Sequence, residues 1–423
     1  MIDKKLVGTL SNELVALQKP IRILSSVAWD DEVAADFFAA GATKQPAVDA
    51  DYYQNNRPLR FDPDDVRAGL HDFRARLAKR LGGSAIGDLL LARAAEYVRV
   101  VDMVQARGTP EFAQISAELY GGPADHIHEG GPTLASLGQV MDEALVNIDS
   151  GAWQPPEDPC FTAAEGVKIL KGRLEGLCGA EQVRVMIDDG IVADAAAGGD
   201  YIKLREDAMF SERDLRVLEV HEGWVHVATT LNGRAQPYAT FLAKGTPSTT
   251  STQEGLAVFT EITTMSSTPA RLRKVTRRML AIDMADQGAT FLEVYRWFID
   301  LGHSESDAWV SSVRVFRGST PTGGPFTKDL SYSVGFLEVY DFIRLAVQRG
   351  RLERLPLLFS GKLAVREVGT IASLAEEGLV EPPGIIPPHM QDVSALASWL
   401  AYSNLLNRID LKKMEIHLEA ALS

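Results

Sequence analysis

The chain has little cysteine, no long apolar run and fewer basic than acidic residues. Cys160 and Cys178 are its only cysteines, too few for a disulfide framework and outside any Cys-x-x-Cys spacing. No segment reaches the roughly 18 uninterrupted apolar residues of a transmembrane helix. Residues 1–20 carry charges and lack the apolar core of a signal peptide. We therefore expect a cytoplasmic protein that does not span a membrane.

The shortage of basic residues excludes some partners. The 43 lysines and arginines against 57 aspartates and glutamates give a net charge of −14. A negative field repels nucleic acid and anionic membranes, so neither is expected as a general partner. With 46% hydrophobic and 24% charged residues, the chain can bury the core of one large or two moderate domains. Composition leaves the oligomeric state open.

Histidine is also scarce, yet two of the eight histidines lie close together in the sequence H-E-G-W-V-H at 221–226. A glutamate follows within Q-E-G-L-A at 253–257. Two imidazoles and one carboxylate are typical of a catalytic zinc site, in which water takes the fourth position. The predicted Zn²⁺ ligands are His221, His226 and Glu254. Glu222 is then left as the general base, which favours hydrolysis over the iron chemistry that the same ligand types support.

The spacing of the two histidines predicts an irregular helix. The usual zinc-protease motif places its histidines at i and i+4, on one side of a helix. Here the spacing is i and i+5, which puts the side chains about 140° apart on an ideal α-helix. Both can reach one ion only if the helix is locally overwound or carries a π-type bulge, and Gly223 lowers the cost of that distortion. Without a metal, they are an ordinary pair of helix histidines.

The flanking segments favour the metal site. Residues 200–205 alternate like a half-buried strand, and Ser211 with Asp214 has the pattern of a capping box at a helix start. Asn232-Gly233 is typical of a helix end. A strand leading into a helix that carries the histidines is the core layout of zincin-type metallopeptidases, in which an edge strand also binds the substrate backbone.

Glu254 has an ordinary explanation as well. A glutamate near a helix start is favoured by the helix dipole without any metal. We expect Ser251 or Thr252 to cap that helix, with apolar residues that pack it beside the histidine helix so that Glu254 faces the ion.

The chain divides at the proline-rich run 150–159, where a helix cannot continue. We predict an N-terminal helical region over 1–150 and a catalytic domain with C-terminal helices over 160–423. The predicted helices before the break are 64–80, 86–106, 109–119 and 133–148, after an irregular stretch at 40–62. Helix 162–176 and strands at 183–188 and 200–205 follow, and the rest is helical. The expected fold class is α+β and mostly helical, with a small sheet beside the metal-binding helix.

These residues carry a family resemblance. The H-E-x-x-x-H and Q-E-G-L-A strings resemble the bacterial flavohaemoglobin expression-modulating QEGLA-motif proteins, a family related to the microtubule-associated tyrosine carboxypeptidases of animals. Further matching stretches are 232–237, 314–318 and 326–329, so the resemblance covers most of 160–350. It implies a zincin-like metallopeptidase with zinc on the two histidines and Glu254, a catalytic Glu222, and release of a C-terminal residue such as tyrosine.

A C-terminal exopeptidase also needs a cation for the terminal carboxylate, and the planar fork of arginine suits that task. The candidates in or near the matching stretches are Arg234, Arg314, Arg317 and Lys328. Tyr332 follows, and its phenol is a candidate donor to the oxygen that becomes negative during hydrolysis. The plain alternatives are solvated surface charges and a half-buried core tyrosine.

The remaining six histidines have simpler explanations than zinc binding. His126 and His128 form a His-x-His that would bind metal on a strand, but glycines beside it favour a polar turn. The others, expected on the surface or in loops, are His71, His303, His389 and His417.

We therefore expect a zinc-dependent peptidase, a carboxypeptidase by resemblance, whose substrate is the C-terminus of a peptide or protein. The alternative is a non-catalytic regulatory protein with a structural or sensing zinc site. A free Glu222 beside the first ligand favours the enzyme, because a structural site has no use for a base.

Overall fold

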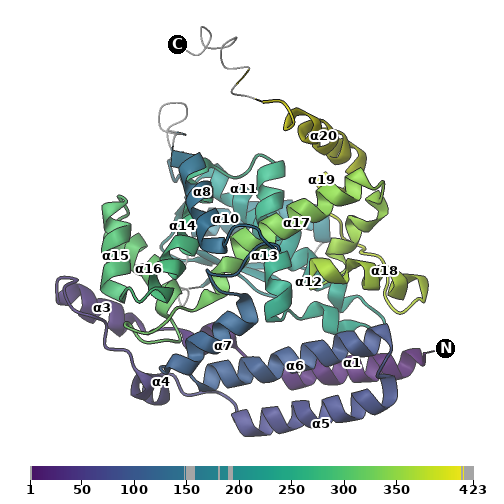
Figure 1. Cartoon of the computed structure of the whole chain (residues 1–423), viewed down its shortest axis with the longest axis horizontal. Helices are drawn as coiled ribbons and strands as arrows, with labels where there is room; N and C mark the ends of the chain where they lie inside the picture. The colour runs from purple at the N-terminus through teal and green to yellow at the C-terminus, as the bar shows by residue number, and fades with distance from the viewer. Residues whose placement is uncertain are drawn as a thin grey trace.

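The computed structural model describes residues 2–146, 148, 158–179, 182–188, 194–410 and 413. The described residues form a mostly helical α+β fold, as the sequence predicts (Figure 1). The predicted proline-rich break lies mainly outside them, so the division at 150–160 stays a prediction. No helix among them is long and apolar enough to cross a membrane.

The first part of the chain is helical. Its helices are α1 (Lys4–Gln18), α2 (Ile23–Val27), α3 (Asp31–Ala39), α4 (Ala50–Asn56), α5 (Pro63–Leu81), α6 (Ala85–Gln105), α7 (Pro110–Tyr120) and α8 (Leu134–Val146). The four helices predicted before the break correspond to α5–α8 within three residues at each end. The prediction that 40–62 is irregular was wrong for α4. The Asp49 side chain caps this helix, and the buried Tyr53 hydroxyl accepts a hydrogen bond from the Trp29 side chain.

A small sheet lies beside the helix that carries His221 and His226. Its strands are β2 (Arg184–Asp188), β3 (Ala195–Ala197) and β4 (Tyr201–Arg205), in the order β2-β4-β3. β4 is parallel to β2 and antiparallel to β3. The strand that precedes the histidine helix, β4, is therefore the central strand, and the edge strands of this sheet are β2 and β3. Two short strands, β1 (Phe161–Thr162) and β5 (Met209–Phe210), pair separately.

The sheet packs on two helical segments, because Ile202 and Leu204 of β4 are buried against them. One is α10 (Ala163–Cys178), the predicted helix 162–176, and the other is formed by α11 (Glu212–Leu218) and the π-helix η1 (Glu219–Val227). Ser211 caps α11 with Asp214 in the predicted capping box.

The histidine helix continues as α12 (Ala228–Arg234), which ends within one residue of the predicted Asn232-Gly233. The Asn232 side chain donates to the backbone carbonyls of Phe359 and Ile385 instead of capping the helix. A Cβ at Gly233 would lie 2.5 Å from the backbone of residues 242–243, so this glycine permits a close approach within the core.

The rest of the described chain is helical, again as predicted. Its α-helices are α13 (Pro247–Thr263), α14 (Pro269–Asp286), α15 (Phe291–Asp300), α16 (Glu305–Phe316), α17 (Leu330–Gln348), α18 (Val368–Glu376), α19 (Pro388–Gln391) and α20 (Val393–Leu406). The 3₁₀ turns are η2 (Thr240–Ala243), η3 (Thr327–Asp329), η4 (Leu352–Arg354), η5 (Pro356–Phe359) and η6 (Val365–Glu367). One hydrophobic cluster joins α1, α5 and α6 to α13, α17 and α18.

Two helices, α13 and α17, lie at the centre of the fold (Figure 1). They cross where each carries a glycine. A Cβ on Gly255 would lie 1.9 Å from the backbone of Gly335, and one on Gly335 would lie 1.8 Å from the Ser251 carbonyl oxygen. Any side chain at either position would push the helices apart. The glycine of Q-E-G-L-A therefore holds Glu254 against the helix that carries Tyr332.

Candidate metal centre

The two histidines lie on a nine-residue π-helix, η1, as their spacing predicts. A π-helix holds more residues per turn than an α-helix, so positions i and i+5 return to one side. The ring centroids of His221 and His226 are 4.9 Å apart. Gly223 has a packing role here, because a Cβ on it would lie 2.2 Å from the Leu174 side chain of α10.

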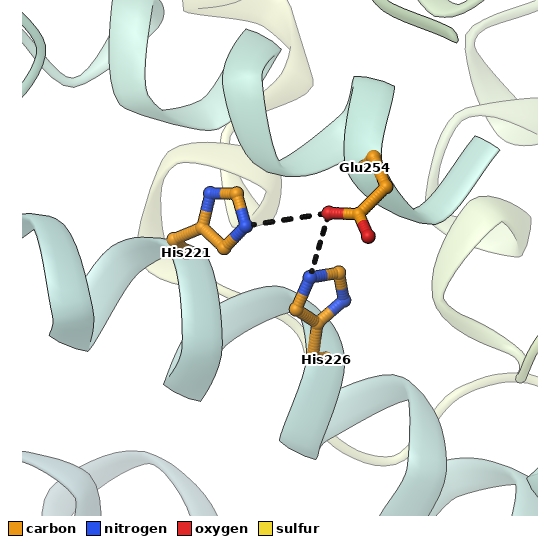
Figure 2. A group of neighbouring side chains, drawn as sticks. All are labelled: His221, His226 and Glu254. Atoms are coloured by element: carbon orange, nitrogen blue, oxygen red, sulfur yellow. Dashed lines mark ion pairs between the residues drawn. The ribbon is translucent and has the colours of Figure 1, made fainter. Parts of the chain in front are cut away.

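The three predicted ligands converge on one point (Figure 2). The Nε2 atoms of His221 and His226 lie 3.5 and 3.4 Å from the same Glu254 oxygen, Oε2. Two ligand atoms about 2.1 Å from a tetrahedral ion are roughly 3.4 Å apart, so this spacing fits zinc. The Glu254 Oε2 atom is buried and accepts no hydrogen bond within the described residues, as expected for an atom kept for a metal.

Glu254 reaches this point from the middle of α13. The expected cap at Ser251 or Thr252 was wrong, because Pro247 starts the helix one to two turns earlier with Thr246 as its N-cap. The helix dipole at an N-terminus therefore does not explain this glutamate. Burial raises the pKa of Glu254, but Lys328 and the two histidines outweigh it and hold the pKa well below its usual range.

The other Glu254 oxygen is held by a cation. Lys328 Nζ donates to Glu254 Oε1 at 3.1 Å, so one carboxylate oxygen faces the lysine and the other faces the histidines. The contact fixes the orientation of the carboxylate and uses one of the three ammonium donors. Lys328, predicted to bind the substrate's carboxylate, thus lies at the centre with a protein partner already in place.

An outer shell that sequence reasoning missed supports His221. The Nδ1 atom of His221 lies 2.6 Å from Glu261 Oε1, and Arg271 donates to both oxygens of this glutamate at 2.5 and 2.6 Å. Burial opposes ionisation, but the hydrogen bonds from Arg271 and His221 lower the pKa of Glu261 to about 2. Two helical turns separate Glu254 from Glu261, so both lie on one face of α13. This spacing is the sequence signal that could have identified Glu261 as a second carboxylate near the histidines.

A second network, also missed, holds His226. The partly buried Lys362 donates from Nζ to the His226 backbone carbonyl at 2.9 Å and to Gln253 Oε1 at 2.8 Å. Thr229 Oγ1 donates to the same Gln253 oxygen at 2.8 Å. Burial lowers the pKa of Lys362 to about 7. The glutamine of Q-E-G-L-A thus ties the π-helix to a lysine more than a hundred residues away, which no local pattern reveals.

Glu222 remains free for chemistry. It follows His221 on η1 and is partly exposed. Across the described residues its carboxylate makes no hydrogen bond or ion pair, unlike Glu254 and Glu261. A carboxylate beside the metal ligands without a protein partner can exchange a proton with water.

Beside the ligands lies a cluster of arginines. Arg278, Arg314 and Arg317 surround the buried Asp329, and only Arg314 hydrogen bonds to it, at 2.6 Å. The guanidinium groups of Arg278 and Arg317 lie 3.9 and 4.0 Å from this carboxylate and form no hydrogen bond within the described residues. Burial, together with nearby Arg314, lowers the pKa of Arg317 to about 10. Three guanidinium groups facing one carboxylate leave a positive excess that an anion can neutralise.

Tyr332 connects this cluster to the metal ligands. Its ring stacks on His221 at 6.3 Å, lies 5.0 Å from the Arg278 guanidinium and 5.7 Å from Lys328 Nζ. Arg278 was not a sequence candidate, because it lies on α14, outside the matching stretches.

Comparison with known families decides the relationship. The sequence matches the family described as microtubule-associated tyrosine carboxypeptidase over residues 35–408. The chain belongs to this family. The match extends well beyond the expected 160–350 and includes most of the N-terminal helices. The family model therefore covers nearly the whole chain. A search of curated proteins finds no match.

Not every candidate residue of this carboxypeptidase-family chain joins the centre. Arg234 is 3.3 Å from Asp200 at the start of the sheet, and none of its ion pairs in the described part of the chain involves another candidate. His126 lies in the expected turn, with its Nδ1 2.6 Å from the Gly131 carbonyl oxygen. The surface position expected for His389 was wrong, because its ring stacks on Trp224 of η1 at 5.9 Å and both ring nitrogens are buried.

Proposed function

We propose that the chain is a zinc-dependent, zincin-like carboxypeptidase that removes one residue from the C-terminus of a peptide or protein. The observation that carries the proposal is the convergence of two histidine nitrogens on one unpartnered oxygen of Glu254, with Glu222 free beside them. Membership of the carboxypeptidase family supports the reaction class. Cytoplasmic location, expected from the two cysteines, belongs to the same proposal.

In this mechanism His221, His226 and Glu254 hold the ion. When bound there, zinc lowers the pKa of water and polarises the peptide carbonyl. Glu222 accepts a proton from the attacking water and returns it to the leaving amine. Tyr332, whose hydroxyl has no hydrogen-bond partner among the described residues, is placed to donate to the carbonyl oxygen as negative charge develops.

Carboxylate recognition falls to the arginine cluster. Lys328 and Arg314 each donate one hydrogen bond, to Glu254 and Asp329, whereas the guanidinium groups of Arg278 and Arg317 donate none within the described residues. A terminal carboxylate bound there satisfies both guanidinium groups and offsets the positive excess around Asp329. Arg317 therefore stays a candidate for binding the terminal carboxylate, and Arg278 is a second candidate.

The test compares matched peptides with a free or amidated C-terminus on the zinc-loaded protein, followed by mass spectrometry over time. Acid peptides should lose one residue, whereas amides should resist, because a neutral amide lacks the negative charge and the second acceptor oxygen with which a carboxylate pairs with the arginines. Equal cleavage of both forms, or internal cuts, would contradict the carboxypeptidase proposal. No cleavage of any peptide would favour the alternative, a regulatory protein that keeps zinc for stability or sensing.

A further inference from the structure

Helix α7, from the predicted N-terminal region, packs against η3, the turn that contains Lys328. Phe112, Ser116 and Tyr120 of α7 are buried and follow one another at four-residue spacing, so they lie on one face of the helix. Ser116 Oγ accepts a hydrogen bond from the Thr327 backbone nitrogen at 2.8 Å. This face of α7 therefore holds the turn immediately before Lys328.

Tyr120 is the last residue of α7, and it lies beside the arginine cluster. Its ring meets the Phe326 ring edge-on, with the two centroids 5.7 Å apart. The guanidinium group of Arg317 lies 5.6 Å from the centre of the same Phe326 ring. One phenylalanine thus contacts both Tyr120 and a guanidinium group that is a candidate for binding the terminal carboxylate.

The hydroxyl group of Tyr120 has no hydrogen-bond partner within the described residues, although only 7% of the residue is exposed. Burial raises the pKa of Tyr120 to about 12, and the nearby cations Lys328 and Arg317 oppose this rise only in part. The phenol is therefore protonated at neutral pH and is available as a donor.

Nothing around this hydroxyl offers it an acceptor. Lys328 and Arg317 carry only donors, so neither can accept the phenol proton. Glu96 also influences the pKa of Tyr120, but its two oxygens accept hydrogen bonds from Ser248 at 2.8 and 2.7 Å. A donor beside two cations is satisfied by a bound anion, which the cations attract as well.

Two other buried tyrosines show the usual structural arrangement. Tyr53 donates to the Ser319 carbonyl oxygen at 3.2 Å, and Tyr97 donates to the Gly245 carbonyl oxygen at 3.2 Å. Each of these hydroxyl groups joins two segments of the fold, as buried tyrosines usually do. Tyr120 joins none within the described residues, so its hydroxyl is free for a ligand.

We propose that Tyr120 is a substrate-binding residue whose hydroxyl donates a hydrogen bond to the terminal carboxylate held by Arg317. This inference rests on the proposed carboxypeptidase function. A carboxylate has about four acceptor positions, so it can pair with a guanidinium group and still accept from a phenol. The N-terminal helical region then completes the substrate site, because α7 supplies this donor and holds the turn that bears Lys328.

The test is Tyr120→Phe in the zinc-loaded full chain, which removes the hydroxyl and keeps the ring against Phe326. KM for peptides with a free C-terminus should rise roughly 10- to 100-fold, the effect of losing one hydrogen bond to a charged group, with kcat nearly unchanged. The preference for acid over amide peptides should narrow by the same factor. Zinc content and melting temperature should match the wild type. Tyr295→Phe is the control, since this tyrosine is equally buried but packs on Phe37 in another cluster.

Binding is measured separately from cleavage in Glu222→Gln, which keeps Tyr120 and the arginines. The acid peptide should bind more tightly than its amide, and adding Tyr120→Phe should reduce this difference. If the wild type trims acid peptides and Tyr120→Phe changes neither KM nor the acid preference, the role of Tyr120 is overturned while the carboxypeptidase proposal survives. If no peptide is cleaved yet the acid preference in binding depends on Tyr120, the reverse holds. Equal losses for acid and amide peptides, or no acid preference in binding, would also overturn the role of Tyr120.

Discussion

The imidazole of His221 donates from Nδ1 to Glu261 at 2.6 Å while its Nε2 faces Glu254, so one ring links two carboxylates of the same helix. The Glu261 contact fixes which nitrogen carries the proton and leaves Nε2 free to bind a metal. Arg271 completes the chain by donating to both Glu261 oxygens.

Glu261→Gln should weaken zinc binding by roughly 10- to 100-fold, because the neutral amide no longer raises the basicity of His221. Chelator competition on the purified protein measures the change. Glu376→Gln, at an exposed position of α18, is the matched control. Unchanged zinc affinity would leave Glu261 as no more than a partner of Arg271.

Glu222→Gln should lower hydrolysis by a factor on the order of 10² to 10⁴ while about one zinc per chain remains bound. The amide keeps the size of the side chain but cannot accept a proton. His221→Ala and His226→Ala should instead release the metal, and elemental analysis separates the two behaviours. Zinc loss in Glu222→Gln would make Glu222 a ligand.

Lys362→Met should reduce zinc affinity by about tenfold, an effect of the size expected for an outer-shell partner. The melting temperature of the metal-free protein should change little, because Gln253 Oε1 keeps its bond from Thr229 and the His226 carbonyl keeps one from Thr230. Lys244→Met, at another partly buried lysine, is the control. Equal loss of stability with and without zinc would show a purely structural role.

Arg317→Gln and Arg278→Gln should each reduce the preference for acid over amide peptides by about 1–3 kcal/mol, through KM more than through zinc content. Arg234→Gln should leave the preference intact, because Arg234 pairs with Asp200 beside the sheet. Peptide kinetics on the three variants decide whether the cluster reads the carboxylate. A preference that survives Arg278→Gln and Arg317→Gln would assign that task elsewhere.

His389 should make the fold sensitive to acid. Burial lowers the pKa of His389 to about 4, whereas an unfolded histidine has a pKa of about 6.5. The unfolded chain therefore binds the extra proton first, and stability present above pH 6.5 is lost as the pH falls toward 4. We therefore expect the free energy of unfolding, measured with denaturant, to fall less steeply with decreasing pH in His389→Phe than in the wild type. The two slopes should differ by up to about 1.4 kcal/mol per pH unit in this window. His71→Gln, exposed on α5, should keep the wild-type slope.

Much of the architecture could be predicted because local patterns report local structure. Helices α5–α8, the strands of the sheet and the capping box at Ser211 follow from spacing within a few residues. The π-helix could be predicted as well, since two ligands at i and i+5 cannot share an ion on a regular helix. The start of α13 was wrong, because Thr246 and Pro247 begin the helix before Ser251. The end of the histidine helix was predicted to within one residue, but Gly233 serves a close approach to residues 242–243 there.

The sequence by itself determined the types of the predicted ligands, the glutamate beside the first histidine and the distortion of the helix, because residue types are read directly and His221 and His226 are five positions apart. Only the tertiary structure decided what surrounds them. Lys362 reaches His226, Arg278 joins Arg317, and Ser116 of α7 holds Thr327 through contacts across more than a hundred residues or between separate helices. Such pairings are selected by the burial of whole helices, and the spacing of residues along the chain carries no record of them.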